Sequence, residues 1–266
     1  VFQMSLPIVK LNDGIHVMDA DGSNGRKLVD EEFWSTMPHT WGPEAGQITF
    51  YGPTSETTGE LLILDVENPG NQRFLHETGT MYFPPAWSPD RSRLAYCWRE
   101  GRNPLELYVI DAEGRAEVRL TEDARAAYVA WSPDGERLGY TAWTPSPFNA
   151  EGGDRFTDVF VIHAEEGAVP RLITTTEYTA STPVWLGDRQ WIAYAVSGDV
   201  HVVNVESGET QSLGVRNRPI PINRFDWLDP FRAVSSAGKL PLSWGAIKAP
   251  ARASSPNPHA PPPKRH

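Results

Sequence analysis

A repeated hairpin motif constrains the fold of this chain more than any other feature. Residues 130–140 read Ala-Trp-Ser-Pro-Asp-Gly-Glu-Arg-Leu-Gly-Tyr, and residues 86–96, 44 positions earlier, read Ala-Trp-Ser-Pro-Asp-Arg-Ser-Arg-Leu-Ala-Tyr. Each copy predicts a short apolar strand, a tight turn and a second strand, because proline fixes φ and the residues after it favour chain reversal. A repeat at this period indicates stacked structural units rather than one irregular core.

Tryptophan marks the first strand of this hairpin five times, with separations of 46, 44, 54 and 42 residues. The five positions are Trp41, Trp87, Trp131, Trp185 and Trp227. The longest interval contains an insertion at residues 144–153, whose Pro, Ser and Gly content is typical of an exposed loop. Helical periodicity is absent between the strands, so each repeat predicts β-structure only.

A second strand-and-turn feature alternates with the tryptophan strands. Five β-rich runs end in Asp, Asn or His, whose side chains can bond the backbone just beyond and start a turn. The runs cover residues 15–19, 62–65, 107–111, 159–163 and 200–204. The first run has no tryptophan strand before it, and Trp227 has no such run after it.

This mismatch at the two ends predicts how the repeats close. We expect an all-β fold, a β-propeller of five four-stranded blades in which strands from both termini complete one blade; six blades is the alternative. Closure removes exposed sheet edges. The predicted propeller covers residues 1–248, and the Pro-rich residues 249–266 are expected to form a disordered tail.

Composition excludes several classes of function. The net charge of −10 argues against a nucleic-acid partner, which requires a basic surface. No run of about 18 apolar residues occurs, so membrane insertion is not expected. Cys97 is the only cysteine, which excludes an intrachain disulfide and a multi-cysteine zinc site.

The repeat resembles the WD-like repeat of TolB-type β-propellers. Residues 86–122 and 130–175 carry its pattern most fully, with Trp-Ser-Pro-Asp followed by a basic residue, Leu and Tyr, and then an Asp-Ala-Glu-Gly or similar turn. Residues 18–24 match the turn closely, whereas the hairpins at Trp41, Trp185 and Trp227 lack the Ser-Pro-Asp core. The resemblance covers residues 8–248 and implies a propeller and an extracytoplasmic location.

The resemblance also implies limits on function. TolB has a separate N-terminal domain without a counterpart here, and its propeller has six blades. Related propellers are gating domains of prolyl-oligopeptidase-like enzymes or are sugar-acid lyases. A peptidase of that type needs a Gly-x-Ser-x-Gly elbow and a partner histidine, and no such run occurs, so its catalytic domain would lie outside this sequence.

Two patterns have the residue types of metal sites. Asp19, Asp21 and Ser23 have the oxygen spacing of a calcium loop, although the glycine at 25 comes one place late. A lyase-like metal site could combine His39 and His76. The simpler interpretation is a strand-connecting turn and two edge residues. We therefore predict no metal, no cofactor and no catalytic residue, with a metal-dependent carbohydrate lyase or hydrolase as the alternative.

The connections that precede the tryptophan strands are the predicted binding positions. In propellers such connections open onto the face around the central channel. Here they contain aromatic residues and arginines, which binding surfaces concentrate. The candidates are Trp34, His39, Tyr82, Tyr128, Tyr178, Arg216, Arg218 and Arg224. The alternative for about half of the rings is packing between blades.

The expected function is a non-enzymatic scaffold, a monomer, that binds a protein, peptide or extended ligand on its channel face. Arg216, Arg218 and Arg224 lie close together in an acidic chain. They favour a partner that offers carboxylates, or they pair with local acids such as Asp226 and Asp229.

Overall fold

The computed structural model describes residues 14–19, 23–30, 38–145, 155–176, 178–187 and 189–214. The chain forms two compact units, Val1–Trp227 and Leu228–His266, and all described residues belong to the first. Trp227, the predicted boundary at residue 248 and the predicted tail therefore lie outside the described residues.

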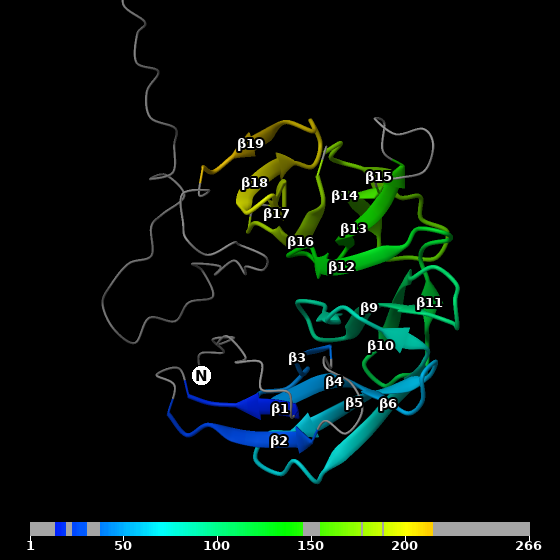
Figure 1. Cartoon of the computed structure of the whole chain (residues 1–266), viewed down its shortest axis with the longest axis vertical. Helices are drawn as coiled ribbons and strands as arrows, with labels where there is room; N and C mark the ends of the chain where they lie inside the picture. Colours follow the sequence, from blue (N-terminus) through cyan, green and yellow to red (C-terminus); the bar gives the residue numbers. More distant parts are fainter. Residues whose placement is uncertain are drawn as a thin grey trace, which may run out of the picture. The chain divides into compact units, whose positions relative to one another are not determined.

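Antiparallel sheets make up all of the regular structure that is described, and they follow one another in chain order (Figure 1). Sheet 1 contains β1 (Gly14–Val17) and β2 (Arg26–Asp30). Sheet 2 contains, in spatial order, β3 (His39–Trp41), β4 (Gln47–Pro53), β5 (Gly59–Asp65) and β6 (Gln72–Thr78).

Sheet 3 has a first strand in two pieces, β7 (Thr80–Met81) and β8 (Ala86–Trp87), which both pair with β9 (Arg93–Arg99). It continues with β10 (Glu106–Asp111) and β11 (Val118–Arg119). Sheet 4 contains β12 (Ala126–Trp131), β13 (Arg137–Pro145), β14 (Arg155–His163) and β15 (Arg171–Leu172). Sheet 5 contains β16 (Ala180–Trp185), β17 (Trp191–Val196), β18 (Asp199–Asn204) and β19 (Thr210–Ser212).

The sequence repeats match these sheets strand for strand. Trp41, Trp87, Trp131 and Trp185 each end the first strand of a sheet, and the predicted strand-and-turn runs form β5, β10, β14 and β18. The predicted all-β blades are confirmed. The count of five stays a prediction, because sheet 1 shows two strands in the described residues. None of the described residues forms a helix that is long and apolar enough to cross a membrane.

Strand β13 extends further than the sequence indicates. The insertion is predicted to begin at Thr144, but the strand continues to Pro145, which pairs with Arg155 of β14. Thr144 and Pro145, the described part of the insertion, are therefore paired strand residues rather than loop residues. Residues 146–154 lie outside the described residues.

The Ser-Pro-Asp turns are held by a repeated set of hydrogen bonds. Ser88 Oγ donates to Asp90 Oδ1 at 2.6 Å and accepts from the backbone N–H of Arg93 at 3.0 Å. In the second copy, Ser132 Oγ donates to Asp134 Oδ1 at 2.5 Å and accepts from the N–H of Arg137 at 2.9 Å. These serines and aspartates are therefore turn residues, as their register in the repeat indicates.

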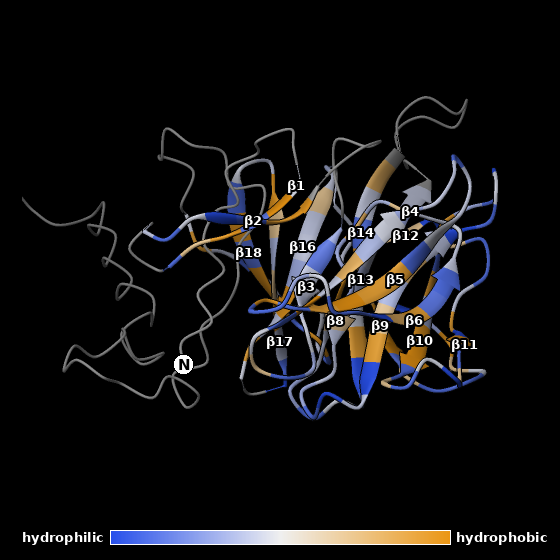
Figure 2. Ribbon diagram, turned by 90° about the horizontal axis from the view of Figure 1, so that it is seen from below, coloured by the Kyte–Doolittle hydropathy of each residue, from blue (hydrophilic) through white to orange (hydrophobic). Residues whose placement is uncertain are grey.

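Each tryptophan packs its indole against the preceding sheet. Trp87 Nε1 donates to Thr49 Oγ1 of sheet 2 at 2.9 Å, and Trp131 Nε1 donates to the Ala86 carbonyl of sheet 3 at 2.8 Å. Buried apolar clusters fill the spaces between consecutive sheets. Figure 2 shows apolar stretches along the strands and hydrophilic residues in many of the connections. The repeated tryptophans therefore join the sheets.

A repeated arginine covers the outer side of these indoles. The guanidinium of Arg93, on sheet 3, lies 4.7 Å from the ring centre of Trp131, and its nitrogens donate to the Ala164 and Gly135 carbonyls at 3.0 and 2.6 Å. Arg137, on sheet 4, lies 4.9 Å from the ring centre of Trp185. One arginine thus combines a cation–π contact with hydrogen bonds to the next sheet.

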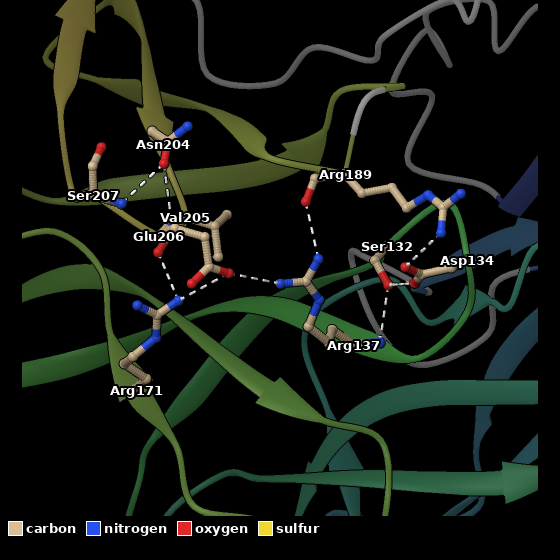
Figure 3. A network of polar contacts seen from close by, with 9 residues as sticks. All are labelled: Ser132, Asp134, Arg137, Arg171, Arg189, Asn204, Val205, Glu206 and Ser207. Carbon is tan, nitrogen blue, oxygen red and sulfur yellow. Dashed lines mark hydrogen bonds and ion pairs between the residues drawn. The ribbon is translucent and has the colours of Figure 1, made fainter.

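Figure 3 shows the polar contacts of Arg137 with sheet 5. Arg137 donates to the Arg189 carbonyl at 2.9 Å and forms an ion pair with Glu206 at 3.5 Å. Glu206 also pairs with Arg171 at 3.8 Å, and Arg189 pairs with Asp134 at 3.5 Å. Polar contacts in both directions therefore join the turns of sheets 4 and 5.

Replacing Arg93 with alanine is expected to lower the free energy of unfolding by about 2 to 3 kcal/mol, because a cation–π contact and two charge-assisted hydrogen bonds are lost together. The measurement is the urea midpoint at an unchanged slope. Arg102→Ala is the matched control, since Arg102 is exposed. Equal midpoints for the two variants would contradict the assigned role of Arg93.

The hydrogen bonds of the Ser88–Asp90 turn predict that the free energy of unfolding depends on pH in the acidic range. Hydrogen bonds from Ser88 and Ser92 lower the pKa of Asp90 from 3.8 to about 2. A carboxyl whose pKa is lower in the folded state stabilises the fold above its unfolded pKa, and this contribution is lost as pH falls from about 3.8 to about 2. The stability difference between wild type and Asp90→Asn should therefore shrink across that window. Glu122→Gln, at an exposed carboxylate outside the turn, is the control, and a constant difference for Asp90→Asn would contradict the prediction.

Candidate binding surface at the rim end of the sheets

The antiparallel order brings the predicted binding connections to one end of each sheet. We call this the rim end: the first strand begins there, the second strand ends there and the third begins there. The Ser-Pro-Asp turns lie at the opposite end, the turn end. Side chains far apart in sequence therefore meet at the rim end of sheets 3 and 4.

Three ring contacts lie at the rim end of sheets 3 and 4, and we call their residues the aromatic–arginine rim. In sheet 3, Arg99 Nη2 donates to Tyr82 Oη at 2.6 Å, and its guanidinium lies 5.1 Å from the ring centre. Phe83 contacts Tyr128 of sheet 4 with ring centres 4.7 Å apart. The rim consists of Tyr82, Phe83, Arg99, Arg125, Tyr128 and Trp143.

The sheet 4 part of the rim repeats the arrangement of sheet 3. The guanidinium of Arg125 lies 5.8 Å from the ring centre of Trp143. Tyr82 and Trp143 are 47% and 46% exposed, so each arginine rests on a ring that faces solvent. Large exposed rings beside guanidinium groups offer contact area and directed hydrogen bonds, which are the properties of binding surfaces.

Four of the eight predicted site residues lie within the described residues. Tyr82 and Tyr128 belong to the rim, and Tyr178, which is 54% exposed, precedes β16 at the same end of sheet 5. His39 lies in β3 and is half-buried. The remaining four, which lie outside the described residues, are Trp34, Arg216, Arg218 and Arg224.

Packing between blades accounts for part of the predicted surface. Phe83 and Tyr128 are half-buried and contact each other between sheets 3 and 4. Tyr82, Trp143 and Tyr178 keep about half of their surface exposed. The alternative of rings that pack between blades therefore describes the Phe83–Tyr128 pair and not the exposed rings.

Sequence reasoning missed Arg99 and Trp143. Both stand five positions after the leucine that opens the second strand, Leu94 in one repeat and Leu138 in the other, so they occupy the same place in the hairpin. The signal was available, because aligning the repeats over their whole length places a large side chain at this position in both copies. Neither residue lies in a connection before a tryptophan strand, where the binding positions were predicted.

Buried carboxylates beneath the rim end were also missed. Glu106 accepts from Thr121 Oγ1 at 2.6 Å, and Asp199 accepts from Ser212 Oγ at 2.6 Å. Asp158 accepts from the hydroxyls of Thr144 and Thr174, at 2.7 and 3.0 Å. Glu106 and Asp199 begin the third strands of their sheets, and Asp158 lies within β14. Their hydroxyl partners lie at or near the ends of the fourth strands, except Thr144, which lies in β13. These carboxylates join neighbouring strands, because a buried charge is stable only when it is hydrogen-bonded.

The residues of the possible metal sites do not assemble. His39 and His76 lie on β3 and β6, the two outer strands of sheet 2, about 14 Å apart at the usual strand spacing, and His76 pairs with Glu117 at 3.4 Å. The Asp19 carboxylate accepts from Asn24 Nδ2 at 2.6 Å, and Asp21 lies outside the described residues. Across the described ranges, no three His, Cys, Asp or Glu side chains lie close enough to hold a metal ion.

The single cysteine is a core residue. Cys97 is buried, and its thiol donates to the Ala127 carbonyl at 2.8 Å across the junction of sheets 3 and 4. Burial, together with the nearby charge of Glu106, raises the pKa of the Cys97 thiol. A protonated, inaccessible thiol is a packing group rather than a nucleophile.

Solved structures of different proteins share this fold. TolB from Acinetobacter baumannii matches with a TM-score of 0.53 and 18% identity, covering 74% of this chain and 48% of that one. Oligogalacturonate lyase in complex with manganese matches with a TM-score of 0.55 and 12% identity, covering 74% of this chain and 58% of the lyase. A chain of the nidogen/laminin complex matches with a TM-score of 0.50 and 9% identity, covering 71% and 68%.

At these identities the likeness concerns the fold alone, and the chain spans about half the length of the Acinetobacter protein. A comparison with curated protein sequences finds no match. The family model of the TolB β-propeller domain matches residues 9–218, which include every described strand from β1 to β19. The chain belongs to the TolB β-propeller family.

Proposed function

We propose that this chain is a non-catalytic binding module that docks a protein or peptide on the aromatic–arginine rim. The observation that carries the proposal is the pair of half-exposed rings, Tyr82 and Trp143, each with an arginine held against it. Buried aromatic and arginine contacts dominate the binding energy of protein interfaces.

The rim is supported from below, which favours a preformed surface. The Ala126 N–H donates to the Leu105 carbonyl at 2.8 Å, which anchors the connection before β12. Glu106 Oε2 lies 3.4 Å from the N–H of Ala124 in the same connection. A surface that is ordered before binding loses less conformational entropy when a partner docks.

No specific observation favours the enzymatic alternative. The buried acids Glu106, Asp158 and Asp199 are engaged with hydroxyl groups of their own sheets. His39 and His76 lie on opposite edges of sheet 2. A protein partner also agrees with the use of this fold in the nidogen/laminin complex. Trp34, Arg216, Arg218 and Arg224 remain predicted contributors to the same surface.

The proposal is tested by selecting peptides from a phage-displayed random library on the purified chain. The double variant Tyr82→Ala/Trp143→Ala is expected to bind the selected peptides at least about tenfold more weakly, because two anchor rings are lost. Fluorescence anisotropy with labelled peptides gives the affinities, and near-ultraviolet circular dichroism establishes that the variant is folded.

Phe74→Ala is the matched control, since Phe74 is an aromatic residue, 54% exposed, on the outer strand β6. Its affinity for the same peptides should equal that of the wild type. Enrichment of no peptide, or equal weakening by the rim and control substitutions, would overturn the proposal.

A further inference from the structure

Neither rim arginine forms an ion pair with a carboxylate in the described part of the chain. Ion pairs with carboxylates involve five arginines, and none of these ion pairs includes Arg99 or Arg125. The five are Arg26, Arg119, Arg137, Arg171 and Arg189. Other described arginines, such as Arg93 and Arg102, also form none, but Arg99 and Arg125 are held against half-exposed aromatic rings, whereas the ring under Arg93 is buried.

Each rim arginine makes its contacts with an aromatic ring. Arg99 is half-buried: its Nη2 donates one hydrogen bond to Tyr82 Oη, and its Nε is buried without a hydrogen-bond partner in the described structure, so only the Nη groups can face a ligand. Arg125 is exposed beside the ring of Trp143. A guanidinium that rests against a ring keeps N–H donors at its edge, and these match the two oxygens of a carboxylate.

The backbone also holds Arg125 in an uncommon conformation. Its φ is 52°, and that of Asp123 is 54°, so two non-glycine residues of this connection are in the left-handed region. Such a conformation is unfavourable for a residue with a Cβ atom and persists where the surrounding structure enforces it. The connection is thereby fixed in the form that places Arg125 against Trp143.

We infer that Arg99 and Arg125 bind carboxylates of the partner, so that the rim selects an extended peptide segment that carries Asp or Glu next to apolar or aromatic residues. This inference rests on the proposed function and adds the chemical class of the ligand. Phe83 and Tyr128, whose ring centres are 4.7 Å apart across sheets 3 and 4, supply apolar contact on the same rim. The expectation of an acidic partner then rests on two described arginines that are not among the arginines singled out from the sequence.

The test uses the peptides selected on the rim, each synthesised in an acidic form and in a form with Asn and Gln in place of Asp and Glu. The acidic form is expected to bind at least about tenfold more tightly at about 0.05 M salt, and the ratio should fall at about 0.5 M salt. In Arg99→Met/Arg125→Met the two forms should bind equally. Arg102→Met, at an exposed arginine near the end of β9, should keep the wild-type ratio.

The outcomes separate this inference from the proposed function. If peptides bind and are lost with Tyr82→Ala/Trp143→Ala, but acidic and amide forms bind equally, the carboxylate inference is wrong and the binding function stands. Selected peptides without Asp or Glu lead to the same conclusion. If no peptide binds the rim, both proposals are overturned. An acid preference that Arg99→Met/Arg125→Met leaves unchanged assigns the preference to other residues and also overturns the inference.

Discussion

The tryptophan that packs against the preceding sheet is the contact that joins the described sheets, and between sheets 3, 4 and 5 an arginine of the preceding sheet covers it. Hydrogen bonds within a sheet complete each four-stranded unit, but they do not join one unit to another. The indole of Trp131 is buried against sheet 3, and Arg93 covers it while bonding two carbonyls of sheet 4. Apolar burial, a cation–π contact and charge-assisted hydrogen bonds therefore act at one point.

The arginines at the two ends of the sheets have different partners. At the turn end, arginines such as Arg137 and Arg171 are engaged by carbonyls and by Glu206 of the next sheet. At the rim end, Arg99 and Arg125 are held by rings and have no acid partner within the described ranges. The same residue type thus bonds the next sheet at one end and rests against aromatic rings at the other. The difference arises from which groups the neighbouring sheet presents.

Buried acids join neighbouring strands beneath the rim end. Glu106 and Asp199 begin third strands and Asp158 lies within one, and each accepts a hydrogen bond from a hydroxyl of its own sheet. The connections above them can then carry exposed rings. A fold shared with TolB, with a manganese-bound lyase and with a chain of the nidogen/laminin complex is used with different surfaces, which is why the proposed function rests on the rim residues.

The sequence by itself determined the repeat, the strand order within each blade and the structural role of Ser88, Asp90, Ser132 and Asp134, because turn chemistry and β-periodicity act over a few neighbouring residues. It also predicted Tyr82 and Tyr128 as surface candidates, and both lie at the rim end of the sheets. Only the tertiary structure decided that Arg99 contacts Tyr82, that Trp143 shares its surface with Arg125, and that His39 and His76 lie apart. Those relations depend on register across strands and on packing between sheets, which bring together residues that no local pattern connects.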